Sequence, residues 1–186
     1  MFITYPMCFG LITIASKFSI LYYGKEFEMA GNVMKWLAIT IPIASWSTII
    51  RTQYLVPKEK DKEYLNSVCI GAIINIICNI IFIPKYGCIG ACMGTILAEL
   101  FVMLLQTSIA AKEIKTQVFL RDTFPFLYKS VIMFLIINLI NFMKINDLLI
   151  LVLQIVVGII IYGLLNIKFI LKIINFKDLK KKVIGR

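Results

Sequence analysis

The chain has 186 residues, of which 60% are hydrophobic, and its 20 Lys and Arg residues outnumber its 10 Asp and Glu residues to give a net charge of +10. A soluble domain usually contains about 45–50% apolar residues, so the composition excludes an ordinary soluble fold. The basic residues lie between and after apolar blocks, which is typical of membrane topology, so no nucleic-acid partner is expected. The chain has no His, which excludes His-based catalytic pairs and His-bound metals. No enzyme, metal site or cofactor is expected.

The apolar residues fall in six blocks of about 18–25 residues, the length that an α-helix needs to cross a bilayer. The blocks lack the alternation of barrel strands, so the predicted fold is all-α, a polytopic membrane bundle of six helices. The helices are expected over residues 6–23, 30–55, 64–83, 87–111, 125–143 and 148–170, before a basic cytoplasmic tail over 171–186. The whole chain, 1–186, is expected to form a single transmembrane lobe. The first block lacks a basic n-region, so no cleavable signal peptide is expected.

Three prolines and one amphipathic stretch refine this prediction. Pro42 lies inside the second helix and should kink it, because it removes a backbone hydrogen bond. Pro84 is expected to end the third helix. Pro125 is expected in the first turn of the fifth helix, where its missing N–H costs little. The charged and apolar residues of 112–124 could form a short helix along the membrane interface.

The distribution of Lys and Arg predicts the orientation of the chain. Because cytoplasmic loops carry the excess of basic residues, the distribution places both termini in the cytoplasm of a bacterial plasma membrane. An even number of spans agrees with this placement. The side expected to be cytoplasmic receives Arg51, Lys58, Lys60, Lys62, Lys112, Lys115, Arg121, Lys129, Lys168, Lys172, Lys177, Lys180, Lys181, Lys182 and Arg186. The other side receives Lys17, Lys25, Lys35, Lys85 and Lys144.

Glu99 falls near the middle of the fourth predicted helix. A carboxylate at that depth is costly, so it marks a cavity, an ion or proton site, or a partner. A protonated or hydrogen-bonded structural Glu is the equal alternative. Glu99 is therefore the candidate for ion coupling.

Small and polar residues form stripes on the third and fourth predicted helices. Asn75 and Asn79 lie four residues apart on one face, which indicates either a helix–helix seam or a wet cavity, with the seam favoured. Gly90 and Gly94 have the spacing that lets two helix backbones approach closely, so packing is the better interpretation there.

Three further polar residues lie toward helix ends. Arg51 and Gln53 fall near the cytoplasmic end of the second helix, and Lys17 falls toward the outer end of the first. Long basic side chains at such positions often extend to the interface. The alternative is that Arg51 and Lys17 face a central cavity and bind an anionic head group.

The stretch from Pro6 to Glu113 resembles a known family. Its most specific piece is Asn75-x(3)-Asn79 followed by I-P-K-Y-G-x(2)-G-A over residues 83–91, and it also contains L-Y-Y-G-K-E-F over 21–27 and Q-Y-L-V-P-K-E-K-D-K-x-Y over 53–64. These motifs are similar to the C-terminal half of bacterial oligosaccharide flippases. That family comprises the O-antigen and capsule repeat-unit translocases of the multidrug/oligosaccharidyl-lipid/polysaccharide exporter superfamily. The last two helices match the family only in hydropathy.

The resemblance implies twelve to fourteen helices in two lobes around a basic cavity. Such proteins move an undecaprenyl-diphosphate-linked oligosaccharide to the outer leaflet for surface polysaccharide synthesis, and alternating access rocks one lobe against the other. By position, the residues expected near the cavity are Arg51, Lys17, Asn75, Asn79 and Glu99, with Gln53 as a further substrate-binding candidate. The family supplies no catalytic residue.

The chain is shorter than that family, since six helices make one lobe. We therefore expect an N-terminal partner lobe, in the same or a separate chain, besides the bilayer and the lipid-linked oligosaccharide. Two alternatives remain. One is a lobe of a multidrug exporter, whose cavity would carry more acidic residues. The other is a non-transport membrane subunit or an inactive gene remnant.

Overall fold

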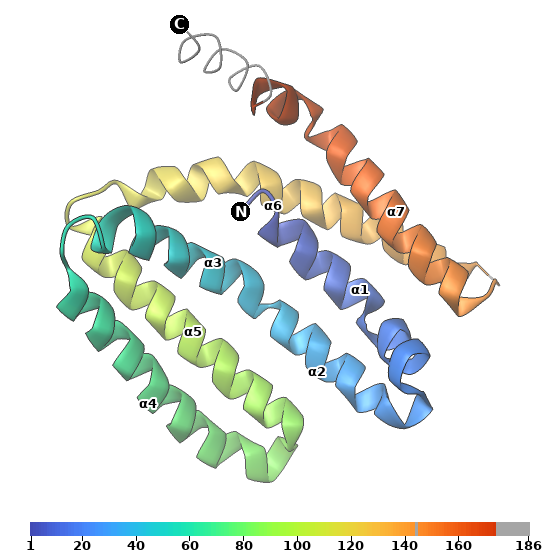
Figure 1. Cartoon of the computed structure of the whole chain (residues 1–186), viewed down its shortest axis with the longest axis horizontal. Coiled ribbons are helices and arrows are strands. Elements are labelled where there is room, and N and C mark those ends of the chain that lie inside the picture. Colours follow the sequence, from blue (N-terminus) through green and yellow to red (C-terminus); the bar gives the residue numbers. More distant parts are fainter. Residues whose placement is uncertain (144, 174–186) are drawn as a thin grey trace, which may run out of the picture.

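The computed structural model of the protein describes residues 1–143 and 145–173, and these residues are almost entirely helical (Figure 1). They contain no strand. The α-helices of the described part are α1 (Thr4–Tyr23), α2 (Glu28–Ala38), α3 (Thr40–Ile50), α4 (Asp61–Tyr86), α5 (Cys88–Ala111), α6 (Thr116–Leu139) and α7 (Asp147–Leu165). Three short segments join them: the 3-10 helix η1 (Lys25–Phe27), the π-helix η2 (Arg51–Leu55) and the 3-10 helix η3 (Ile140–Phe142).

Six helical segments of the described chain are long and apolar enough to cross a membrane, which agrees with the predicted all-α bundle. α2 and α3 count as one of them, because the segment Lys25–Leu55 is helical almost throughout. Large apolar side chains on the outer faces are exposed: Ile76 of α4 is 59% exposed and Ile159 of α7 is 68% exposed. Such surfaces need lipid or protein around them. The chain is a multi-pass membrane protein.

The break between α2 and α3 lies where Pro42 predicts a disturbance. A proline ring clashes with the carbonyl four residues earlier and supplies no N–H to it. For Pro42 that carbonyl belongs to Ala38, which is the last residue of α2. The N–H of Ile39 instead donates to the carbonyl of Trp36 at 3.2 Å, three residues back, which closes a tighter turn than that of the α-helix. A break at Ile39 thus divides the second span.

Several predicted boundaries are wrong, and the largest error is at the start of the fifth predicted helix. α6 begins at Thr116, so Pro125 lies inside the helix and the stretch 112–124 is mostly the first turns of that span instead of a separate interfacial helix. α4 continues through Pro84 to Tyr86. The last span ends at Leu165, and a turn at Asn166 separates it from the helical residues 167–173. In the first two cases backbone hydrogen bonding continues beyond the apolar block, because polar ends of a span reach the head groups.

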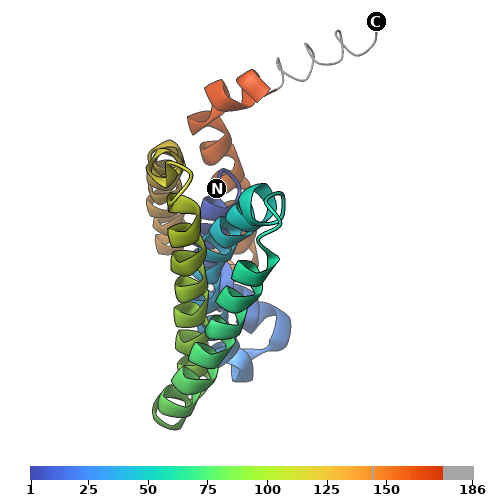
Figure 2. The ribbon, with the colours of Figure 1, turned by 90° about the vertical axis from the view of Figure 1, so that its left-hand side faces the viewer.

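α4 and α5 form a tightly packed antiparallel hairpin, and Figures 1 and 2 both show them side by side. Gly87 makes the turn with a φ of 56°, a left-handed conformation that favours glycine. An added Cβ at Gly90 would lie 2.3 Å from the carbonyl oxygen of Phe82, and one at Gly94 would lie 2.3 Å from Oδ1 of Asn79. The prediction that Gly90 and Gly94 serve close helix packing is confirmed.

The remaining helices form two groups, of which one packs against this hairpin. α3 lies against α5, while α1 contacts α2, α6 and α7. One buried cluster joins Trp46, Ile50 and Leu55 of the second span to Ala110 of α5. The other joins Met133 and Ile137 of α6 to Tyr162 of α7. The first group, α3 to α5, holds the polar groove described next.

Candidate functional site

A groove of about 440 Å³ opens between α3, η2, α4 and α5. We call it the α3–α5 groove. Each helix contributes residues three or four positions apart, which is the spacing of one helix face. Its lining consists of Ala44, Ser47, Thr48 and Arg51 from the second span, Tyr64, Val68, Gly71, Ala72 and Asn75 from α4, and Thr95, Ala98, Glu99, Val102 and Gln106 from α5. Half of these side chains are polar, which is unusual for a surface within membrane-spanning helices.

Arg51 stands at one end of the groove, on the first residue of the π-helix η2. The N–H of Val56 bonds the Arg51 carbonyl at 2.9 Å, five residues back, which gives the segment its wider turn. The guanidinium carbon lies 4.7 Å from the centre of the Tyr64 ring, so the cation stacks on an aromatic face. Among the described residues no acceptor bonds the guanidinium N–H groups, so they remain available for an anion.

Glu99 lines the same groove from the middle of α5. Among the described residues it makes no hydrogen bond and no ion pair, although its side chain is only partly exposed. A carboxylate held at this depth without a partner costs free energy unless it faces a hydrated cavity, is protonated or binds a cation. Its position on the groove wall leaves the carboxylate accessible from the groove.

The spacing of Asn75 and Asn79 left open whether they lie in a helix–helix seam or line a cavity, and the structure places one residue in each setting. Asn75 lines the groove, and its Nδ2 lies 3.5 Å from Oγ1 of Thr95 on α5. Asn79 donates to Oδ1 of Asn75 at 2.9 Å but lies in the seam, packed against Gly94. Its own Oδ1 is buried without a partner. The groove therefore includes Asn75, and Asn79 supports it from the adjacent seam.

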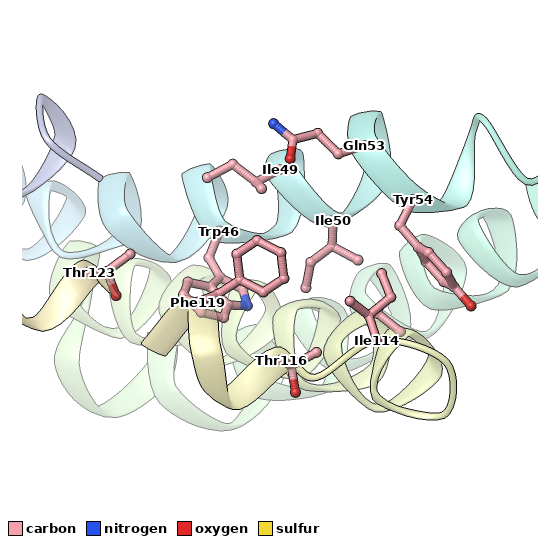
Figure 3. A pocket seen from close by; sticks show the side chains of 10 residues that line it. Trp46, Ile49, Ile50, Gln53, Tyr54, Ile114, Thr116, Phe119 and Thr123 are labelled. Atoms are coloured by element: carbon pink, nitrogen blue, oxygen red, sulfur yellow. The ribbon is translucent and has the colours of Figure 1, made fainter. Parts of the chain in front are cut away.

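Gln53 does not line the α3–α5 groove. It lies at a second, smaller cavity of about 130 Å³ between the second span and the start of α6 (Figure 3). The walls of this cavity are largely apolar and include Trp46, Ile50 and Phe119. Arg51 and Gln53 line different cavities because side chains two positions apart point to different faces of a helix.

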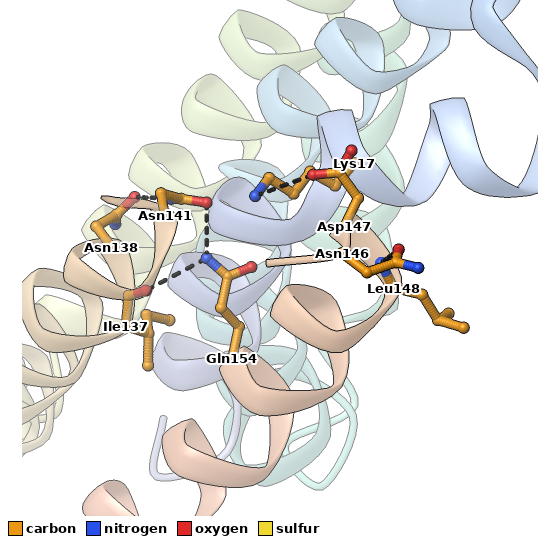
Figure 4. A network of polar contacts seen from close by, with 8 residues as sticks. All are labelled: Lys17, Ile137, Asn138, Asn141, Asn146, Asp147, Leu148 and Gln154. Atoms are coloured by element: carbon orange, nitrogen blue, oxygen red, sulfur yellow. Dashed lines mark hydrogen bonds and ion pairs between the residues drawn. The ribbon is translucent and has the colours of Figure 1, made fainter. Parts of the chain in front are cut away.

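Lys17 also lies outside the groove. Its Nζ is 3.5 Å from Oδ1 of Asp147 in the first turn of α7 (Figure 4). Beside this ion pair, the buried Gln154 donates to Oδ1 of Asn141 at 3.1 Å, and Oε1 of Gln154 has no partner. Lys17 thus belongs to the packing of α1 against α7. The structure brings Arg51, Asn75 and Glu99 together and leaves Lys17 and Gln53 elsewhere.

The sequence interpretation missed several polar residues of this region, among them the buried Gln106 and Ser67. Gln106 lies seven residues after Glu99 on the same face of α5, and it lines the groove. Ser67 is buried and accepts a hydrogen bond from Nε2 of Gln106 at 3.0 Å. Helical spacing from Glu99 is the signal that could have found Gln106, since residues seven apart share a face. No comparable signal marks Ser67.

A charged cluster joins two loops at the end of the bundle that carries Arg51. Glu113 accepts from Lys58 at 2.5 Å and from Lys60 at 2.6 Å, and Lys60 also donates to the hydroxyl of Tyr54 at 2.8 Å. The hydrogen bond from Lys58 and then that from Lys60 lower the pKa of Glu113 from 4.5 to about 2. The hydrogen bond to Glu113, and then that to the Tyr54 hydroxyl, raise the pKa of Lys60. The cluster ties the loop before α4 to the loop after α5.

Comparisons with known proteins relate the whole arrangement to flippases. No model of a protein family matches the chain. Over 95 residues, which are 51% of the chain and 24% of the relative, it is 24% identical to a Shigella dysenteriae protein that carries the name of an O-antigen transporter. The structure matches the lipid II flippase MurJ, in an inward closed conformation, with a TM-score of 0.78 and 24% identity.

The structural match covers 93% of the chain and 37% of MurJ, so the chain spans well under half the length of either relative. A match over 93% of the chain takes in most of the described helices. It therefore shows that the chain has the fold of part of MurJ. The resemblance to flippases of the multidrug/oligosaccharidyl-lipid/polysaccharide exporter superfamily is confirmed for a partial chain.

Proposed function

We propose that the chain forms part of a flippase that moves a lipid-linked saccharide across the bacterial plasma membrane, with undecaprenyl-diphosphate-linked oligosaccharide as the substrate. One observation supports this most: a polar groove that holds a stacked arginine and a carboxylate lies within membrane-spanning helices. The similarity to an O-antigen transporter and to MurJ supports the same substrate class. The chain would contribute binding and conformational change, with no chemical step.

In this proposal Arg51 binds the diphosphate. A guanidinium offers several N–H donors in one plane, which suits phosphate oxygens, and stacking on Tyr64 holds that plane in place. Asn75 offers amide groups to the neighbouring part of the head group. Asn79 holds Asn75 in position through their 2.9 Å hydrogen bond. Lys17 and Gln53 lie outside the groove, so the proposal gives them no part in binding the substrate.

Glu99 is proposed as the ion-coupling group. Its carboxylate faces the groove and has no partner among the described residues, so a proton or a monovalent cation has access to it. Neutralising this charge lowers the cost of closing the groove around it. Closure and charge neutralisation would then occur together, which is the requirement for coupled transport.

The groove is open on one side, and a further protein surface is proposed to cover it. Polar walls that face lipid are costly, so a further set of helices, in the same or a separate chain, is proposed to complete the cavity. The size of the native product tests this. With a C-terminal tag at the chromosomal locus, a band much heavier than the 21.3 kDa of this chain supports a continuous partner lobe. A band at 21.3 kDa together with no co-purifying membrane protein would contradict the proposal.

The orientation of the chain is likewise a proposal, with both termini in the cytoplasm. Residues 174–186, which contain much of the basic tail, and Lys144 lie outside the described residues.

Figure 1 shows the α4–α5 turn at the opposite end of the hairpin from the loops that carry Lys58 and Glu113. Cys88 at this turn is exposed, and Cys92 one turn later is buried. An impermeant maleimide added to intact spheroplasts should label the wild type but not Cys88→Ser, while Cys92→Ser should change nothing. Labelling of Cys88 only after lysis would place the α4–α5 turn in the cytoplasm and contradict the proposed orientation.

The functional test uses a strain that depends on this gene for surface polysaccharide. Arg51→Ala and Glu99→Gln should each lower surface polysaccharide and cause the lipid-linked precursor to accumulate, at unchanged protein level. Lys62→Ala, an exposed basic residue that does not line the groove, is the matched control. Normal polysaccharide in both groove variants would refute the proposed site. Selective loss of resistance to cationic drugs would favour the multidrug exporter instead.

A further inference from the structure

Gln106 is a buried amide whose hydrogen bonding is incomplete. Its side chain is 1% exposed and lines the α3–α5 groove from α5. Nε2 donates to Oγ of Ser67 at 3.0 Å, and Oε1 has no partner. An amide offers two donors and an acceptor with two lone pairs, so most of its capacity is unused.

Turning the amide over does not remove the deficit. Ser67 already donates its hydroxyl to the carbonyl of Tyr64 at 2.7 Å, so it accepts from Gln106 and has no second proton to give. With the amide reversed, Oε1 would face an acceptor and Nε2 would be left without one. A polar group in this state is costly within a membrane, where no bulk water compensates. Its position beside the groove suggests what completes it.

Ser67 and Tyr64 connect Gln106 to Arg51, the proposed anion site. Ser67 lies one turn after Tyr64 on α4 and bonds its carbonyl, and the Tyr64 ring lies beneath the guanidinium of Arg51. The groove wall therefore carries a cation and, next to it, a neutral amide with an open acceptor. A diphosphate joined to a sugar presents the complementary order, an anion followed by hydroxyl donors.

We propose that Gln106, held by Ser67, forms a neutral subsite that accepts a hydrogen bond from a hydroxyl or amide N–H of the first sugar of the substrate. This rests on the proposed function, because Arg51 must hold the diphosphate for the sugar to reach Gln106. The subsite recognises the saccharide, and Arg51 binds the diphosphate, whose charge is common to all such lipids. Gln106 is in this sense a specificity-determining residue.

The test compares two probes on the chain purified from its native membrane in lipid nanodiscs, together with any partner that co-purifies. The probes are undecaprenyl diphosphate and undecaprenyl diphosphate bearing one N-acetylglucosamine. Gln106→Met keeps the length of the side chain and removes its polar groups. It should weaken binding of the sugar-bearing probe about 3- to 10-fold, the effect of one neutral hydrogen bond, and leave the sugar-free probe unchanged.

Gln154→Met is the matched control, because Gln154 is also 1% exposed with an unpartnered Oε1 but lies away from this groove. It should change neither affinity. If Gln106→Met fails to fold, Ser67→Ala releases the amide from its support and should produce the same selective loss. Equal weakening of both probes, no weakening of either, or the same selectivity in Gln154→Met overturns the subsite.

Arg51→Ala separates this failure from failure of the proposed function. If Arg51→Ala weakens both probes and Gln106→Met weakens neither, the groove binds the diphosphate and only the sugar subsite is wrong. If the wild type binds neither probe, or Arg51→Ala has no effect on either, the proposed function fails and the subsite fails with it.

Discussion

A methyl group added at Gly90 tests how closely α4 and α5 must pack. The new Cβ would lie 2.3 Å from the carbonyl oxygen and 2.5 Å from the carbonyl carbon of Phe82, and 2.8 Å from the backbone nitrogen of Ile83. All three are backbone atoms, so no side chain can rotate away. The backbones must separate by about 1 Å to restore ordinary contact distances. Overpacking of this kind costs about 1–3 kcal/mol.

Thermal unfolding of the purified protein in detergent measures this cost. For a domain of this size, each kcal/mol lowers Tm by about 2–4 °C, so Gly90→Ala should unfold several degrees below the wild type. Gly10→Ala is the control, since an added Cβ there meets nothing within 4 Å. A Tm for Gly90→Ala equal to that of Gly10→Ala would refute the close approach of the two helices.

Two further substitutions test polar contacts. Glu113→Gln removes the carboxylate shared by Lys58 and Lys60. Because the folded-state pKa of Glu113 is about 2 and its ordinary value is 4.5, the variant should be less stable than the wild type above pH 4.5. That difference should vanish as pH falls toward 2, and a constant difference would contradict the cluster. Thr107→Val removes the acceptor of the buried Trp46 indole N–H, 3.0 Å away. It should cost about 1–3 kcal/mol in thermal unfolding, and an unchanged Tm would contradict the bond.

The number of spans was predictable because it depends on the length and apolarity of each block. The break in the second span was predictable for a similar reason: the effect of Pro42 on the carbonyl of Ala38 is local in sequence. The true limits of α4 and α6 were not, since hydropathy falls at the first charged residues while backbone hydrogen bonds continue through Pro84 and Pro125. Local patterns identify a helix face but do not show where hydrogen bonding stops.

The candidate site was predictable only in part. Helical spacing placed Asn75 and Glu99 on definite faces, and the structure unites those faces with Arg51 in one groove. Lys17 was expected near the cavity from its position in the first helix and its charge, and its partner Asp147 lies so far along the chain that no local pattern indicates the pair. Which helix packs against which is decided by tertiary contacts. Gln106 was overlooked because a lone amide in an apolar helix has no distinctive motif.

The most direct test of the central claim is the leaflet distribution of the lipid-linked saccharide in spheroplasts of a strain that depends on this gene. An impermeant lectin specific for the glycan measures the fraction that reaches the outer leaflet. The account predicts a high outer-leaflet fraction in the wild type and in Lys62→Ala, and accumulation on the cytoplasmic side in Arg51→Ala. An outer-leaflet fraction in Arg51→Ala equal to that of the wild type, at equal protein level, would contradict the assignment of the α3–α5 groove as the path of the head group.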